Sequence, residues 1–173
     1  MQSLSEVIPA STVIVEEAPS HRPAMQKYLP IRTSGGFYTM ASGGLGYGLP
    51  AAVGVALGQQ RKVICLLGDG AAMYSIQALW TAVQEKLPIV VVVLNNKEYG
   101  ALKSFSKLLN AKDPPPGTDL PGINFSALAR GVGFQSLLIE GSAELKNTLV
   151  RALLANAPVL VDIAIDPSTG GAF

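Results

Sequence analysis

Two apolar runs, each ending in polar residues, constrain the fold of this chain more than any other feature. The first, Val63 to Leu67, ends in Gly68-Asp69-Gly70, and the second, Ile89 to Leu94, ends in Asn95-Asn96. Residues 73–86 between them are expected to form a helix that connects two parallel strands. Such crossovers are right-handed almost without exception, so both polar ends emerge at the same carboxyl edge of one sheet. Open α/β proteins bind their ligands at that edge.

Asp69 and Asn96 bring a carboxylate and an amide oxygen to this edge. These hard oxygen donors suit a magnesium ion that carries a phosphate. Asp69 alone could instead cap the following helix, and two asparagines at a strand end could simply form a turn. The spacing of the two polar ends favours ligation over both alternatives. The sequence therefore predicts a metal-bridged diphosphate site.

The rest of the chain alternates between expected strands and expected helices. The strands cover residues 12–15, 37–39, 134–139 and 159–165, and the helices cover 20–28, 49–57, 99–110, 125–130 and 143–155. This alternation predicts an α/β fold with a doubly wound, mainly parallel sheet and helices on both faces. Residues 113–122 are rich in proline and are expected to form an ordered surface loop that can act as a lid. The tail at residues 168–171 is expected to fray.

The composition predicts one compact domain, residues 1–173, without a charge bias. Hydrophobic residues make up 49% of the chain and charged residues 14%, with 13 basic and 12 acidic side chains. The balance gives no indication of a nucleic acid or an anionic membrane as partner. No apolar run approaches the roughly 18 residues of a transmembrane helix, and no secretory signal opens the chain, so a cytoplasmic location is expected. The low charge indicates that another chain or further domains cover part of the surface.

Three further features have competing interpretations. The cluster Gly43-Gly44-Leu45-Gly46 lacks the third glycine and the downstream acidic residue of a dinucleotide-binding fingerprint. It favours a loop whose backbone carbonyls line a ligand, with Leu45 projecting between glycines. His21, the single histidine, follows a strand end, but a surface or helix-capping role is favoured over catalysis. Cys65, the single cysteine, lies in an apolar run and is expected to be a core residue.

Side chains near the two polar ends also have expected positions. The first helix after Asp69 is expected to pack on the sheet through Tyr74, Leu79 and Trp80. Three lysines follow the asparagine pair and could attract an anionic substrate, although a solvated helix face is the preferred interpretation: Lys103, Lys107 and Lys112.

Gly68-Asp69-Gly70 together with Asn95-Asn96 resembles the cofactor signature of thiamine-diphosphate-dependent enzymes. Both halves fall at the spacing and on the elements that this superfamily uses. Further segments resemble the benzoylformate decarboxylase family: residues 43–52, 78–82, 99–102 and 119–123. The resemblance extends over nearly the whole chain. It implies the C-terminal, diphosphate-binding domain of a three-domain subunit of much greater length.

The resemblance also implies the roles of individual residues. Asp69 and Asn96 would bind Mg²⁺ through side-chain oxygens, and Glu98 through its backbone carbonyl. The diphosphate would be surrounded by Gly68, Gly70, Ala71, Tyr99, Gly100 and Ser20, with Ala71 contributing its N–H alone.

The other end of the cofactor would meet the glycine cluster. The Gly43 carbonyl would accept a hydrogen bond from the aminopyrimidine, next to Gly44, and Leu45 would lie beneath the cofactor and hold its two rings in a V. These contacts would give Gly43 and Leu45 a role in catalysis. The pocket for the substrate's side chain would be lined by Ala101, Leu102 and Phe105.

The implied reaction is decarboxylation of a 2-oxo acid, with chemistry that belongs largely to the cofactor. In the superfamily a glutamate of the N-terminal domain, usually from a neighbouring subunit, activates the aminopyrimidine. No Glu of this chain matches that motif, so the chain alone is expected to be inactive and to act within a homodimer or tetramer. Met1 directly precedes what is mid-protein sequence in these enzymes, which favours a fragment.

Four accounts stay open at this point. The chain is a fragment of a decarboxylase, or a separate subunit of a two-chain decarboxylase whose partner chain supplies the glutamate. Within the same superfamily, it could belong to a carboligase, an acyl-CoA lyase or an acetolactate-synthase-like enzyme. Leu45 counts against the last, which usually carries Met there. The fourth account is a module that binds diphosphate ligands without catalysis.

Overall fold

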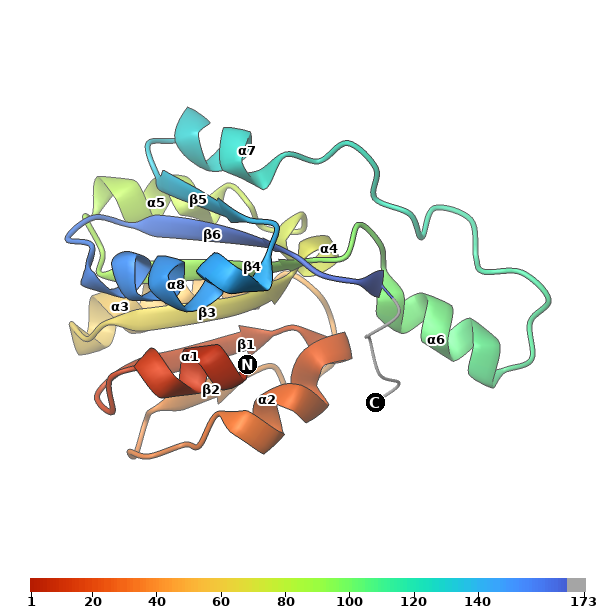
Figure 1. The fold of residues 1–173 in the computed structure, drawn as a ribbon, viewed down its shortest axis with the longest axis horizontal. Helices are drawn as coiled ribbons and strands as arrows, with labels where there is room; N and C mark the ends of the chain where they lie inside the picture. Colours follow the sequence, from red (N-terminus) through yellow and green to blue (C-terminus); the bar gives the residue numbers. More distant parts are fainter. Residues whose placement is uncertain (168–173) are drawn as a thin grey trace.

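The computed structural model describes residues 1–167, which form one α/β layer structure (Figure 1). Six strands in this part of the chain form a single parallel sheet in the order β2-β1-β3-β4-β6-β5. The strands are β1 (Val13–Glu17), β2 (Phe37–Thr39), β3 (Val63–Gly68), β4 (Ile89–Asn95), β5 (Gln135–Ile139) and β6 (Val159–Ala164). Every predicted strand is present, so the predicted parallel sheet is confirmed. The predicted fraying at 168–171 lies outside the described residues.

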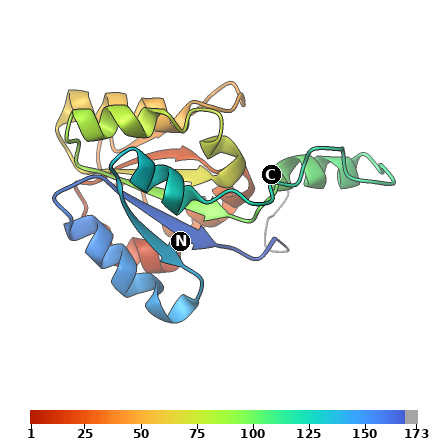
Figure 2. The same ribbon diagram turned by 90° about the horizontal axis from the view of Figure 1, so that it is seen from above.

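Helices cover both faces of the sheet. They are α1 (Gln2–Val7), α2 (Arg22–Tyr28), α3 (Gly48–Gln59), α4 (Asp69–Ala72), α5 (Ala78–Gln84), α6 (Gly100–Leu108), α7 (Phe125–Gly131) and α8 (Leu145–Leu154), with short 3₁₀ turns η1 (Pro19–His21) and η2 (Ser142–Glu144). One core contains residues of α3, α5 and α7, and the other contains residues of α1, α2 and α8. Figure 2 shows α3 and α5 on one side of the sheet and α1 and α8 on the other. This is the predicted doubly wound arrangement.

The two cores explain why the central strands are continuous apolar runs. Successive side chains of a strand point to opposite faces, so Cys65 and Leu67 of β3 enter one core while Ile64 and Leu66 enter the other. All four are buried. Burial also raises the pKa of the Cys65 thiol, which agrees with its predicted place in the core.

The connection between β3 and β4 differs from the predicted continuous helix over 73–86. The chain leaves β3 as the single turn α4, continues through turns at residues 73–77, and becomes helical again only in α5. The turns are held by i→i−3 hydrogen bonds such as Tyr74 N–H to Ala71 O. Tight turns share the i, i+3 spacing of a helix, so the apolar period does not separate the two. The six-residue helix α1 was also not predicted.

The side chains that pack α5 on the sheet are not all the predicted ones. Leu79 and Ala82 are buried against the sheet, whereas Trp80 is 57% exposed. Tyr74 in the preceding turns is also 57% exposed. The expected packing is therefore confirmed for Leu79 and wrong for Trp80 and Tyr74. In a helix of seven residues, Leu79 and Ala82 share one face, and the residue next to Leu79 points away from it.

Helix α6 and the residues after it extend away from the sheet, as Figures 1 and 2 both show. Residues 113–122, here named the proline-rich loop, contain no helix or strand, as predicted. The loop returns to the end of β4, where Asp119 forms an antiparallel bridge with Glu98. Tyr99 N–H donates to Thr118 O at 2.8 Å, and Leu120 N–H donates to Lys97 O at 2.8 Å. No helix within residues 1–167 is long and apolar enough to cross a lipid bilayer.

Candidate functional site

A cavity of about 580 Å³ lies at the carboxyl edge of β1, β3 and β4. Its volume falls within the usual range of small-molecule sites, roughly 300–1,000 Å³. All predicted site residues except Gly44 line it: Ser20, Gly43, Leu45, Gly68, Asp69, Gly70, Ala71, Asn96, Glu98, Tyr99, Gly100, Ala101, Leu102 and Phe105. Residues from four separate parts of the chain thus meet at the edge where the parallel strands were expected to bring Asp69 and Asn96 together.

The ends of β3 and β4 place two buried polar side chains side by side. The strands pair in register with Gly68 beside Leu94, so Asp69 and Asn96 leave the sheet together. Asp69 is 2% exposed and Asn96 is 7% exposed. The Asn96 amide lies 3.0 Å from Asp69 Oδ1 and 2.9 Å from the Glu98 carbonyl oxygen. With the Asn96 oxygen turned toward them, three acceptors converge, as they do at a cation site. With the nitrogen turned toward them, two hydrogen bonds hold the same cluster.

This oxygen cluster fits a magnesium ion that is shared with a phosphate ligand. Within residues 1–167, no three His, Cys, Asp or Glu side chains gather as a metal site of their own. Mg²⁺ typically takes one or two protein carboxylates and completes its shell with phosphate oxygens and water. Asp69 would supply the charged ligand, and Asn96 and the Glu98 carbonyl the neutral ones.

Burial raises the pKa of Asp69, because a charged carboxylate loses solvation inside the cavity wall. Backbone N–H groups oppose part of this rise, among them Gly70 N–H, which donates to Asp69 Oδ1 at 2.8 Å. A bound cation would favour the charged form further.

The second asparagine of the pair faces another strand. Asn95 Nδ2 donates to Asp162 Oδ1 of β6 at 3.0 Å, and Asn95 Oδ1 accepts from Lys97 N–H at 3.2 Å. Burial raises the pKa of Asp162, and the hydrogen bond from Asn95 opposes the rise. Of the two asparagines, therefore, only Asn96 lines the cavity, and Asn95 links β4 to β6.

Gly70 and Tyr99 are in direct contact across the cavity floor. A Cβ atom added to Gly70 would lie 2.4 Å from Tyr99 Cε1, far inside van der Waals contact. The aromatic ring thus occupies the space that a side chain at position 70 would need. Burial raises the pKa of the Tyr99 hydroxyl. The close approach explains why glycine follows Asp69.

The residues predicted around a diphosphate lie beside the oxygen cluster. Ser20 comes from η1, and its Oγ and the Asn96 side chain both lie against the backbone of Gly100. Ala71 is buried in α4 and has no hydroxyl to offer. The wall formed by α6 is apolar, and its Leu102 and Phe105 are about half exposed, at 50% and 45%.

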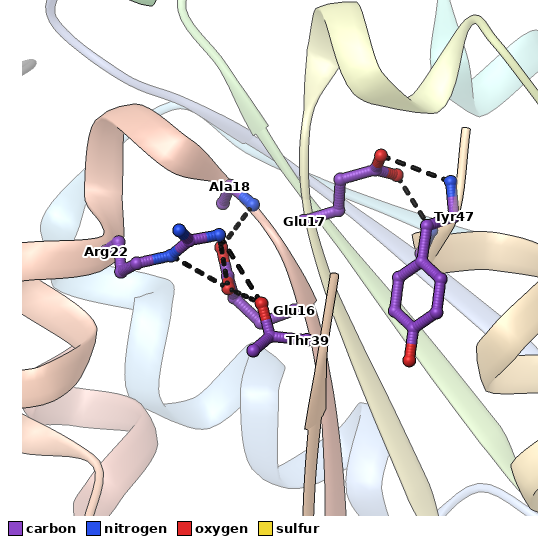
Figure 3. Close-up of polar contacts among 7 residues, drawn as sticks. Glu16, Glu17, Ala18, Arg22, Thr39 and Tyr47 are labelled. Carbon is purple, nitrogen blue, oxygen red and sulfur yellow. Dashed lines mark hydrogen bonds and ion pairs between the residues drawn. The ribbon is translucent and has the colours of Figure 1, made fainter. Parts of the chain in front are cut away.

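Two carboxylates of β1 were not predicted as site residues (Figure 3). Glu16 and Glu17 are each 1% exposed. Glu16 accepts hydrogen bonds from Ala18 N–H at 2.7 Å and Thr39 Oγ1 at 2.7 Å and pairs with Arg22 at 3.1 Å. Figure 3 shows Glu17 directed to the other side, toward Tyr47. Two acids ending an apolar strand at the ligand edge were the sequence signal for this pair.

Glu17 holds the glycine loop, defined as residues 43–48. Its Oε1 accepts from Gly46 N–H at 2.7 Å and Tyr47 N–H at 3.2 Å, and its Oε2 accepts from Gly48 N–H at 2.8 Å. Gly43 and Leu45 of the same loop line the cavity, as does Glu17 itself.

His21 does not cap a helix with its side chain as predicted, and Lys103 does not lie on a fully solvated helix face. His21 precedes α2 without a capping hydrogen bond from its side chain, and it lines the cavity. Its Nε2 is buried without a hydrogen-bond partner among residues 1–167, and burial lowers the pKa of the imidazole. The predicted capping by the side chain is therefore wrong, and since the side chain is half-buried, the preference for a surface role over catalysis stays a prediction. Lys107 and Lys112 are exposed as expected, but Lys103 contacts Glu98 and lies 2.6 Å from Asp119 Oδ1.

Comparison with known proteins gives the family of this chain. Residues 18–163 match the family model described as thiamine pyrophosphate enzyme, C-terminal TPP binding domain, where TPP is thiamine diphosphate. The benzoylformate decarboxylase of Pseudomonas aeruginosa is 42% identical over 92% of this chain and 30% of that protein. The crystal structure of benzoylformate decarboxylase from Polynucleobacter necessarius superimposes with a TM-score of 0.94 at 40% identity, covering 99% of this chain and 33% of that one.

Acetolactate synthases are also related to this chain. A putative acetolactate synthase large subunit of Mycobacterium tuberculosis is 31% identical over 95% of this chain and 33% of that protein. The chain thus spans about a third of the length of the relatives that it matches. With the matched model covering most of its length, this chain belongs to the family of C-terminal thiamine-pyrophosphate-binding domains of thiamine pyrophosphate enzymes.

Proposed function

We propose that this chain binds thiamine diphosphate together with Mg²⁺ and serves as the C-terminal cofactor domain of a 2-oxo acid decarboxylase. The observation that carries the proposal is the convergence of Asp69, Asn96 and the Glu98 carbonyl in a cavity at the carboxyl edge of β3 and β4. The similarity to a benzoylformate decarboxylase at 42% identity supports the reaction class.

In this proposal the metal ligands are Asp69, Asn96 and Glu98. The diphosphate lies against the ends of β3 and β4, surrounded by residues that line the cavity there: Gly68, Gly70, Ala71, Tyr99, Gly100 and Ser20. The glycine loop carries the contacts to the organic part, with Gly43 as the backbone contact and Leu45 as the apolar support.

Bound thiamine diphosphate supplies the carbon nucleophile and the electron sink that decarboxylation of a 2-oxo acid requires. The chain's own residues bind and orient the cofactor and the substrate and exclude water from them. Ala101, Leu102 and Phe105 of α6 form an apolar wall for the substrate's side chain. An aromatic 2-oxo acid such as benzoylformate fits that wall best, because its ring gains most from apolar burial.

The complete activity requires more than this chain. We propose that residues 1–173 form one domain of a larger cytoplasmic enzyme, and that an N-terminal pyrimidine-binding domain or subunit supplies the catalytic glutamate within a homodimer or tetramer. The relatives are about three times as long, which supports further domains.

The similarity to acetolactate synthases supports a second candidate, a carboligase of the same superfamily. The two candidates differ in product. The full-length enzyme given benzoylformate releases benzaldehyde if it is the decarboxylase, and given pyruvate it forms acetolactate if it is the carboligase. A clear preference for pyruvate would overturn the aromatic assignment.

Isothermal titration calorimetry tests the cofactor site directly. Thiamine diphosphate with Mg²⁺ is expected to release heat on binding to the chain, and Asp69→Ala is expected to weaken binding by at least tenfold, about 1.4 kcal/mol. Omission of Mg²⁺ is expected to have the same effect as the substitution. Equal heats for wild type and Asp69→Ala would show that the site assignment is wrong.

A further inference from the structure

Glu17 is an unusual residue for its position. It ends the buried strand β1, its side chain is 1% exposed, and no Lys, Arg or His within residues 1–167 forms an ion pair with it. A buried carboxylate without a cation is costly unless several hydrogen bonds stabilise it. Three successive backbone N–H groups provide this stabilisation, those of Gly46, Tyr47 and Gly48.

These three N–H groups lie at the start of α3, whose N-cap residue, Tyr47, makes no capping hydrogen bond with its side chain. A nearby Ser or Asp could satisfy such groups equally well. The acceptor comes instead from a strand 29 to 31 residues earlier in the chain. A local cap would stabilise the helix alone, whereas Glu17 also fixes the glycine loop relative to the sheet.

The packing around the contact leaves little freedom. A Cβ atom at Gly48 would lie 2.5 Å from Leu67 Cδ2 and 2.9 Å from Glu17 Cβ. Glycine at position 48 therefore lets the loop backbone lie directly on β1 and β3. Since Gly43 and Leu45 line the cavity a few residues upstream, the position of this cavity wall depends on Glu17.

We propose that Glu17 is a positioning residue that holds the glycine loop in the conformation that receives the organic part of the cofactor. The proposal rests on the proposed function for the identity of the ligand. The site then has two halves. Asp69 and Asn96 bind the diphosphate and its metal, and Glu17 positions the glycine loop that contacts the rings.

Amide hydrogen exchange tests the contact without any ligand. Glu17→Gln is expected to speed exchange at the amides of Gly46, Tyr47 and Gly48 by at least about tenfold, as expected for loss of hydrogen bonds to a charged acceptor. Amides in the middle of β4 should keep their protection, which reports that the fold is intact. Glu16→Gln is the matched control, because it removes an equally buried charge from the neighbouring position but should affect the amide of Ala18 instead.

Two ligands then separate positioning from general destabilisation. Glu17→Gln is expected to weaken binding of thiamine diphosphate with Mg²⁺ by at least about tenfold while leaving inorganic diphosphate with Mg²⁺ within about twofold of wild type. Asp69→Ala is expected to weaken both. Glu17→Asp, which keeps the charge but shortens the side chain, should shift the first affinity in the same direction by a smaller factor, and it replaces Glu17→Gln if that variant does not fold.

The possible results distinguish the two proposals. Equal losses for both ligands in Glu17→Gln, or no loss for either, would overturn the role of Glu17, as would unchanged exchange at residues 46–48. If Asp69→Ala left the binding of inorganic diphosphate unchanged, the proposed metal site would be wrong, while the exchange result would still decide whether Glu17 holds the loop.

Discussion

The contact between Gly70 and Tyr99 gives a stability prediction whose size follows from the geometry. In Gly70→Ala the new Cβ would lie 2.4 Å from Tyr99 Cε1 and 2.6 Å from Cδ1. Carbon atoms pack at about 3.5–4.0 Å, so the ring has to retreat by about 1.1–1.6 Å. Overpacking of this kind costs about 1–3 kcal/mol. In a chain of this size, each kcal/mol lowers Tm by about 2–4 °C, so we expect a fall of about 2–12 °C.

Thermal unfolding followed by circular dichroism measures this loss, and Gly54→Ala is the matched control. A Cβ at Gly54 meets no atom within 4 Å, and the residue lies in the interior of α3. The same chemical change should therefore stabilise the protein there by about 0.5–1 kcal/mol. In a Tyr99→Ala background the clash is absent, and Gly70→Ala should then cost less than about 0.5 kcal/mol. Equal Tm values for Gly70→Ala and Gly54→Ala would refute the reasoning, as would an undiminished cost in that background.

Two further predictions concern ionised side chains. Burial raises the folded-state pKa of Asp162, so its contribution to stability is greatest below the unfolded-state pKa of about 3.9 and is lost as pH rises through the folded value. Asp162→Asn should remove this dependence and stabilise the protein at pH 7 relative to wild type; thermal unfolding between pH 4 and 7 checks it, and an unchanged profile would contradict it. Lys103→Met removes the ion pair with Asp119 and should speed amide exchange at Leu120 in the proline-rich loop. Lys107→Met, on the exposed face of α6, should leave that exchange unchanged. Equal exchange in the two variants would disprove that Lys103 holds the loop.

The central sheet could be predicted because its strands are marked twice in the sequence. Apolar runs such as Val63 to Leu67 are too continuous for a half-exposed strand, and the polar residues that follow mark where each strand ends. Parallel pairing then places Asp69 beside Asn96 without any further information. The other predicted cavity residues come from the resemblance to thiamine-diphosphate-dependent enzymes, and only Gly44 among them lies outside the lining.

Other features depend on information that the sequence does not carry locally. The partners of Glu17 are backbone N–H groups 29 to 31 residues away, and a backbone group leaves no mark in a residue pattern. The turns at residues 73–77 share the spacing of a helix, so the exposure of Tyr74 could not be read from periodicity. The sequence places His21 near a strand end but does not show which way its side chain points, and in the structure it lines the cavity.

The exposed position of Trp80 means that the protein carries its own fluorescent reporter. It is the single tryptophan of the chain, and its indole contacts water on the outer face of α5. Emission of such an indole moves to shorter wavelength when water is displaced from it. Docking of another subunit or domain on this face would therefore shift the emission to the blue without an added dye. A partner that covers only α6, which extends away from the sheet, would leave the spectrum unchanged.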